Sequence, residues 1–129
     1  VMQIMPGTGS KVSSMSGHGP YRPEMLRDPS VNVYFGIWYL SRLLDRYDGQ
    51  FPLAVGSYNG GPHNIGRWLR SKHGIGLEEF VDEIPFNETR DYVKKVVRNY
   101  SIYLSIYDED AFVQLPRTTR PDDPEVIDF

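Results

Sequence analysis

The feature that most constrains the fold is a joint of Tyr58, Asn59, two glycines and a proline, within the stretch SYNGGPHNIGRWL at 57–69. An apolar run, FPLAVG, precedes the joint, and an amphipathic run follows it. Glycine permits positive φ and close approach of two backbones, whereas proline is tolerated in the first turn of a helix but not in its interior. The joint therefore predicts two helices that meet with almost no linker and that hold Tyr58 rigidly at the corner. Packing within the turn is the more frequent role of such residues, and presentation to a ligand is the alternative.

Proline and glycine also mark the helix that precedes the joint. Asp28 and Pro29 suit its first turn, because an aspartate side chain accepts hydrogen bonds from the free N–H groups there and proline carries no N–H. Gly49 suits the left-handed residue that follows a helix. We therefore predict a helix over 29–48. The 3.6-residue period assigns its apolar face to Tyr34, Ile37, Trp38, Ser41, Leu44 and Tyr47.

The remaining segments complete an all-α prediction. A short helix is expected from near Thr8, Pro52 and Pro62 open the two helices of the joint, and LEEFVDEI forms a further short helix. Asn87 suits the N-cap of a long final helix. Its apolar stripe consists of Tyr92, Val96, Asn99 or Tyr100, Tyr103 and Tyr107, widened by Val93, Val97 and Leu104. The stretch SGHGPYRPEMLRDPS is expected to be a loop because it is rich in proline and glycine.

Length and composition exclude several classes of protein. The chain has 129 residues, which suffices for one domain with a core. The net charge of -3 offers no basic surface for nucleic acid, and no run reaches the ~18 apolar residues of a transmembrane helix. Periodicity ends near Asp108, and the last segment, LPRTTRPDDPEVIDF, holds three prolines and several charges. We expect one helical domain at 1–107 and a Pro/Asp-rich tail at 108–129.

Histidines and tryptophans are the other candidates for ligand binding. No pair among His18, His63 and His73 has the i,i+4 spacing of a helical metal site, and no carboxylate motif accompanies them, so no metal is expected. Trp38 and Trp68 could stack on sugars, but each lies on an apolar helical face, where a core role is expected.

Three segments occur in a characteristic order: MQIMPGT, DPSVNVYFGIWYLSRLLDRYDGQFPLAVGSYNGGP and IPFNETRDYVKKV. Together they resemble the soluble lytic transglycosylase family, the murein-cleaving branch of the lysozyme superfamily, over nearly all of 1–107. The resemblance implies a lysozyme-like helical fold and a peptidoglycan glycan strand as the partner. It also implies cleavage of the β-1,4 bond between N-acetylmuramic acid and N-acetylglucosamine by a lyase that leaves a 1,6-anhydromuramoyl end. No metal or organic cofactor is implied, and the expected location is the periplasm or outer cell envelope of a bacterium.

The catalytic acid is expected outside this chain. The family's single catalytic glutamate lies in a Glu-Ser motif upstream of a Gly-Leu-Met-Gln segment, and here the match begins inside that segment, at Val1. We therefore expect the domain to be N-terminally truncated, to lack the helix that carries the glutamate and any export signal, and to be inactive alone. Glu88 is the best-placed carboxylate here, but a helix N-terminus favours the ionised form, which is unsuited to an acid. The cluster Glu78, Glu79, Asp82 and Glu83 is expected to be a solvated helix face.

The resemblance assigns six substrate-binding residues, and four of them have a structural alternative given below. It implies that Gln3 and Met5 line the cleft, that Tyr58 and Asn59 present polar groups beside the scissile bond, and that Glu88 and Tyr92 face the same groove. The alternatives are core packing for Met5 and Tyr92, a helix cap for Asn59 and a helix-dipole partner for Glu88.

Two other functions remain open from the sequence. A lysozyme-like hydrolase would use the same fold with water as the nucleophile. A glycan-binding or scaffold module would have the fold without the acid.

Overall fold

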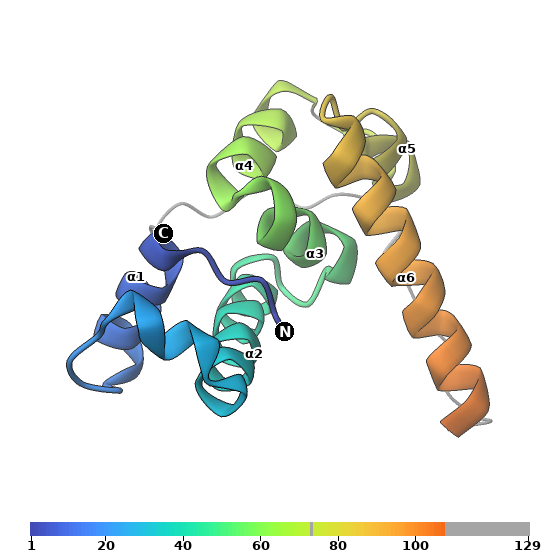
Figure 1. Cartoon of the computed structure of the whole chain (residues 1–129). Helices are drawn as coiled ribbons and strands as arrows, with labels where there is room; N and C mark the ends of the chain where they lie inside the picture. Colours follow the sequence, from blue (N-terminus) through green and yellow to red (C-terminus); the bar gives the residue numbers. More distant parts are fainter. Residues whose placement is uncertain (73, 108–129) are drawn as a thin grey trace.

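The computed structural model describes residues 1–72 and 74–107, and all regular structure in these ranges is helical (Figure 1). The predicted all-α class is therefore confirmed. His73 and the tail predicted over 108–129 lie outside the described residues. The elements are α1 (Pro6–Ser16), the 3-10 helix η1 (Pro23–Arg27), α2 (Pro29–Arg46), α3 (Phe51–Gly60), α4 (Pro62–Ser71), α5 (Leu77–Asp82) and α6 (Asn87–Tyr107).

Capping residues, prolines and glycines predicted most helix boundaries to within one or two residues of the observed positions. Asp28 caps α2, since its carboxylate accepts hydrogen bonds from the backbone N–H groups of Ser30 at 2.8 Å and Val31 at 3.3 Å. Gly49 takes the predicted left-handed conformation, with φ of 76°. Asn87 is not the cap, because the Arg90 N–H already donates to Phe86 O.

One predicted loop contains a helical turn. The stretch after α1 was expected to be irregular, yet η1 forms within it, and Pro23 opens that turn just as the other prolines open α-helices. The first helix, in turn, begins at Pro6 rather than near Thr8. In both places, proline at the first helical position decided the boundary.

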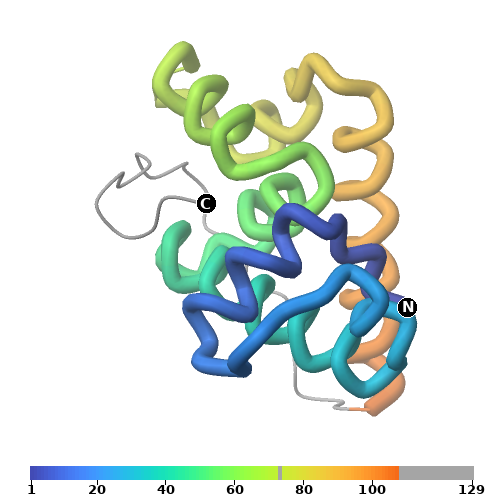
Figure 2. Tube along the Cα trace, turned by 60° about the vertical axis from the view of Figure 1, so that its left-hand side comes forward, coloured from blue at the N-terminus to red at the C-terminus, as the bar shows by residue number. Residues whose placement is uncertain are grey.

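Helix α3 forms the centre of the domain. It packs against α2, α4 and α6, and six consecutive residues of it are buried, from Pro52 to Ser57 (Figures 1 and 2). A helix that is apolar on all sides is buried on all sides, which fits its sequence FPLAVG. Trp68 of α4 joins the same core as predicted, with 6% of its surface exposed, whereas Trp38 is half-buried.

The predicted face of α2 was partly wrong. Tyr34 and Ile37 are 46% and 59% exposed, whereas Tyr47 is buried and Trp38 and Leu44 pack against the core. The buried residues within the helix itself are Asn32, Phe35, Gly36, Tyr39 and Leu43. The helix is apolar over more than one face, so periodicity alone does not select the buried one. Packing against η1, α1 and α3 makes that selection.

The stripe predicted for α6 is covered only near its first half. Thr89 and Val93 are buried, whereas Tyr103 and Tyr107 are 63% and 76% exposed. Figure 1 shows the cause, because the C-terminal half of α6 extends beyond the other helices. The described helices therefore bury this stripe only near its start, where α3 and α5 pack against α6.

No helix among the described residues combines the length and apolar character needed to cross a bilayer. Within 1–72 and 74–107, histidine and carboxylate side chains form no group of three that could hold a metal ion.

Candidate functional site

A cavity of about 520 Å³ lies between the start of α1 and the joint of α3 and α4. We call it the corner cavity. Its lining consists of Met5, Gly7, Thr8, Lys11, Tyr39, Tyr58, Asn59, Gly60, Gly61 and Pro62. Figure 2 shows the two segments that form it, α1 and the α3–α4 corner, next to each other. Residues far apart in the sequence therefore share one concave site.

The corner itself depends on its glycines. Gly61 separates α3 from α4 with φ of 87°, a conformation that side-chain-bearing residues rarely adopt. The Asn64 side-chain amide donates to the carbonyl of Gly60 at 2.8 Å. Asn64 thus provides the polar contact at this helix end, while Asn59 is exposed and lines the corner cavity.

The close approach of α3 to α6 also requires glycine. A Cβ at Gly60 would lie 2.8 Å from Thr89 Oγ1 and 2.9 Å from Thr89 Cγ2. Thr89 directly follows Glu88, which is exposed in the first turn of α6. The contact therefore brings the head of α6 next to the joint that carries Tyr58 and Asn59.

Tyr58 is half-buried, and both its hydroxyl and its ring contact other residues. Its hydroxyl donates to the carbonyl of Met2 at 2.8 Å, and its ring centroid lies 5.3 Å from that of Tyr39. Burial raises the pKa of Tyr58 above its usual value, and the neighbouring Tyr92 and Tyr39 raise it further. Burial also raises the pKa of Tyr39 to about 12. Both phenols therefore remain neutral near pH 7 and act as hydrogen-bonding groups, not as phenolate bases.

The opening segment runs along the edge of this site. Gln3 is exposed and has φ of 55°, which is uncommon for a residue with a side chain. Ile4 is buried with 8% exposure, and Met5 is 69% exposed and lines the corner cavity. Core packing, the alternative considered for Met5, is therefore excluded by its exposure.

The six residues assigned from the resemblance occupy two positions relative to the cavity. Met5, Tyr58 and Asn59 line it together. Gln3 lies next to the Tyr58-bound Met2, Glu88 lies next to the Gly60 contact, and Tyr92 is half-buried near Tyr58. Gln3, Glu88 and Tyr92 thus flank the cavity without being part of its described lining.

Several lining residues were not predicted. Tyr39 was missed because the wrong face of α2 was expected to be buried, and Thr8 and Lys11 were missed because no single polar residue on a short helix stands out. Lys11 is the only basic residue in the described lining, and no carboxylate occurs there. The described lining can therefore bind polar groups of a ligand but offers no carboxylic acid.

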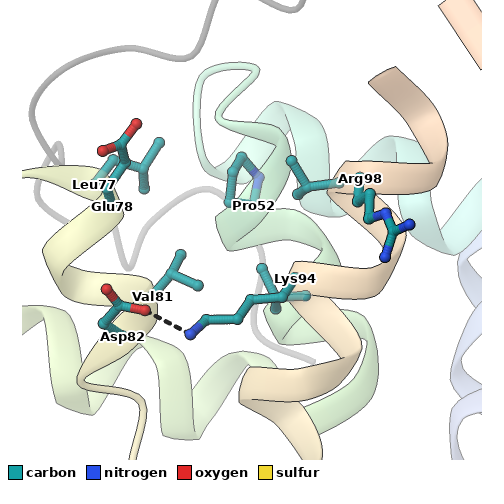
Figure 3. A pocket seen from close by; sticks show the side chains of 9 residues that line it. Pro52, Leu77, Glu78, Val81, Asp82, Lys94 and Arg98 are labelled. Atoms are coloured by element: carbon teal, nitrogen blue, oxygen red, sulfur yellow. Dashed lines mark ion pairs between the residues drawn. The ribbon is translucent and has the colours of Figure 1, made fainter. Parts of the chain in front are cut away.

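A second cavity, of about 390 Å³, lies between α5 and α6 (Figure 3). Its walls include Leu77, Val81 and Pro52, and Lys94 on α6 pairs with Asp82 on α5 at 2.6 Å. Both of these charged side chains are more than half exposed. The carboxylates of α5 thus form the solvated face that the sequence predicted.

Comparison with known proteins gives consistent matches. Residues 1–80 match the family model of the transglycosylase SLT domain. Soluble lytic murein transglycosylases of Salmonella typhimurium and Escherichia coli K12 are 37% and 36% identical over 105 and 107 residues, which are 80% of this chain. The chain spans only 16% of the length of each of these relatives.

Two solved structures resemble this chain in fold. The 70 kDa soluble lytic transglycosylase of Escherichia coli has a TM-score of 0.82 and 32% identity, over 91% of this chain and 20% of its own. The lytic transglycosylase Slt of Pseudomonas aeruginosa has a TM-score of 0.74 and 34% identity, over 81% of this chain and 17% of its own. The latter was solved as an inactive mutant in which a glutamate is replaced by glutamine.

Proposed function

The chain belongs to the transglycosylase SLT domain family, and on this premise we propose that it is part of a peptidoglycan lytic transglycosylase. The reaction is cleavage of the β-1,4 bond between N-acetylmuramic acid and N-acetylglucosamine, with formation of a 1,6-anhydromuramoyl end. The substrate is a glycan strand in the periplasm or outer cell envelope.

The corner cavity is the observation that carries this proposal. Its volume of about 520 Å³ is of the size found for small-molecule sites, which mix apolar walls with a few polar groups. Met5, which is 69% exposed, supplies apolar surface for a sugar ring. Asn59 supplies an amide that can both donate and accept, which suits an N-acetyl group. Gln3 and Glu88, both exposed beside the cavity, extend the polar contacts along the strand.

The proton donor is proposed to come from elsewhere in the protein. Cleavage of a glycosidic bond requires a carboxylic acid whose raised pKa keeps it protonated near neutrality. The described lining of the corner cavity contains no carboxylate, and Glu88 is exposed at a helix N-terminus, which favours its ionised form. The inactive Pseudomonas aeruginosa relative supports a glutamate in this role. We place this glutamate upstream of Val1, and the 129-residue chain then binds glycan without cleaving it.

In this reaction the glutamate first protonates the leaving oxygen. The resulting carboxylate takes a proton from the 6-hydroxyl of muramic acid, and that oxygen attacks the anomeric carbon. The proton balance closes without water. Tyr58 and Asn59 line the cavity at the cleavage point without transferring protons, because the amide is neutral and the neutral Tyr58 hydroxyl donates to the Met2 carbonyl.

Product analysis tests the proposal. A protein that extends this chain upstream through a Glu-Ser pair is incubated with purified peptidoglycan, and the soluble products are separated by mass. Anhydromuropeptides support the transglycosylase, products with reducing ends identify a hydrolase, and strand binding without products identifies a binding module. The Glu→Gln variant of the upstream glutamate is the matched control. Release of anhydromuropeptides by the 129-residue chain alone would refute the placement of the acid.

A further inference from the structure

We propose that Asn32, Gly36 and Tyr58 form a clamp on Met2 and that this clamp positions Gln3 for glycan binding. The three residues come from α2 and α3, and they contact one residue of the opening segment on three sides. The inference rests on the proposed function, because it assigns positioning residues to the same site.

Asn32 holds the backbone N–H of Met2. Its side-chain oxygen accepts from that N–H at 2.6 Å, and its side-chain NH2 group donates to the carbonyl of Leu26 in η1 at 2.9 Å. Asn32 is only 6% exposed, although it lies on a helix face that is otherwise apolar. A buried amide is stable only when it is hydrogen-bonded, so both halves of this side chain have assigned partners.

Gly36 accommodates the side chain of Met2. It lies one turn after Asn32 on the same face of α2. A Cβ at this position would lie 2.6 Å from Met2 Cβ, 2.6 Å from Met2 Cγ and 2.8 Å from Met2 Cε. Since Met2 Cβ is attached directly to the backbone, alanine at position 36 would move the backbone of Met2.

Tyr58 holds the other backbone group of Met2. Its hydroxyl donates to the Met2 carbonyl across 56 positions of sequence. The N–H and the carbonyl of one residue are thus bound by side chains of two different helices. Met2 links α2 and α3 at the edge of the corner cavity, and Tyr58 is a positioning residue through this contact.

The clamp explains the conformation of Gln3. Gln3 has φ of 55°, and such a conformation persists only where the surroundings determine it. Met2 is clamped before it, and Ile4 is buried after it. If Met2 is released, the backbone of Gln3 can relax to an extended conformation. The exposed side chain of Gln3 then points in a different direction. The clamp therefore fixes the direction of Gln3.

The test uses four variants of the 129-residue chain. Gly36→Ala displaces Met2 while both hydrogen-bonding side chains remain. Asn32→Leu removes both hydrogen bonds of Asn32, whereas Asn32→Asp keeps the acceptor for the Met2 N–H and loses the donor to Leu26. Leu77→Val, in α5, is a control for a general loss of stability. NMR relaxation of the Gln3 amide and the Kd for purified glycan strands are measured for each.

The clamp predicts one pattern in both measurements. Gly36→Ala and Asn32→Leu make the Gln3 amide more mobile and weaken strand binding by about tenfold, which is the scale of one lost hydrogen bond. Leu77→Val keeps a rigid Gln3 and an affinity near that of the original chain. Asn32→Asp, whose carboxylate still accepts from the Met2 N–H but faces the Leu26 carbonyl without a donor, does clearly less damage than Asn32→Leu. This pattern supports positioning, because a purely structural role through Leu26 would make Asn32→Asp as harmful as Asn32→Leu.

Two outcomes overturn the clamp. One is that Gly36→Ala leaves both the mobility of the Gln3 amide and the Kd for glycan strands unchanged. The other is that Asn32→Asp and Asn32→Leu weaken strand binding and mobilise Gln3 equally. If the original chain binds no glycan strand, the proposed function fails, and the Gln3 relaxation data alone still decide for or against the clamp.

Discussion

Replacement of Gly60 by alanine tests the contact that joins the α3–α4 corner to the head of α6. The added Cβ would lie 2.8 Å from Thr89 Oγ1 and 2.9 Å from Thr89 Cγ2. Thr89 is 2% exposed and β-branched, so its side chain has little freedom to move aside. The backbones of α3 and α6 must then separate by several tenths of an ångström.

The magnitude follows from two opposing effects. Overpacking of a well-packed core costs about 1–3 kcal/mol. Alanine in place of glycine at the end of a helix recovers up to about 0.5–1 kcal/mol. We expect a net loss of roughly 0.5–2 kcal/mol in the free energy of unfolding, and a Tm lower by several degrees for a domain of this size.

Urea unfolding of a double-mutant cycle is the assay. In Gly60→Ala with Thr89→Ala, the nearest remaining atom of residue 89 is Cβ, at 3.4 Å, which is an ordinary contact. The two changes should therefore couple favourably by about 1 kcal/mol. Gly7→Ala is the matched control for stability, since a Cβ there meets no atom within 4 Å. Additive effects in the cycle, or a Gly60→Ala variant as stable as Gly7→Ala, would refute the reasoning.

Three further predictions concern stability. Asp28→Ala should lower the free energy of unfolding by about 1 kcal/mol, because two N–H groups at the start of α2 lose their acceptor, and Asp28→Asn should restore most of it in urea titrations. The pKa of Tyr39 is about 12 in the folded chain and 10.0 in the unfolded chain, so the neutral side chain stabilises the fold fully below pH 10, and this stabilisation is lost as the pH rises through 12. Unfolding curves measured across this pH range should show the loss, and Tyr39→Phe should reduce it. The exposed Lys94–Asp82 pair should show a coupling below about 1 kcal/mol that disappears in high salt; a larger, salt-resistant coupling would contradict its solvent exposure.

Much of the helix order was predictable because its signals are local. Asp28, Pro62 and Gly49 act on the backbone groups next to them, so their meaning does not depend on the rest of the fold. The buried face of α2 was not predictable in the same way. Its sequence offers more than one apolar face, and the neighbours that select Phe35 over Ile37 come from other parts of the chain.

The same distinction applies to the site. Tyr58 and Asn59 stand out in the sequence because they adjoin the glycine corner, and both line the corner cavity. The role of Asn32 had no local signal, because it depends on a hydrogen bond to Met2, thirty positions away. The role of Gly36 also had no local signal, because glycine is needed there only to make room for the side chain of Met2.

The central claim is that a glycan strand binds at the corner cavity, and an NMR titration of the 129-residue chain with purified glycan strands tests it most directly. The account predicts that the largest shift changes occur at Gln3, Met5, Tyr58 and Asn59, with little change at Asp82 and Lys94 in the cavity between α5 and α6. Changes centred on that second cavity, or no changes at any strand concentration, would contradict it.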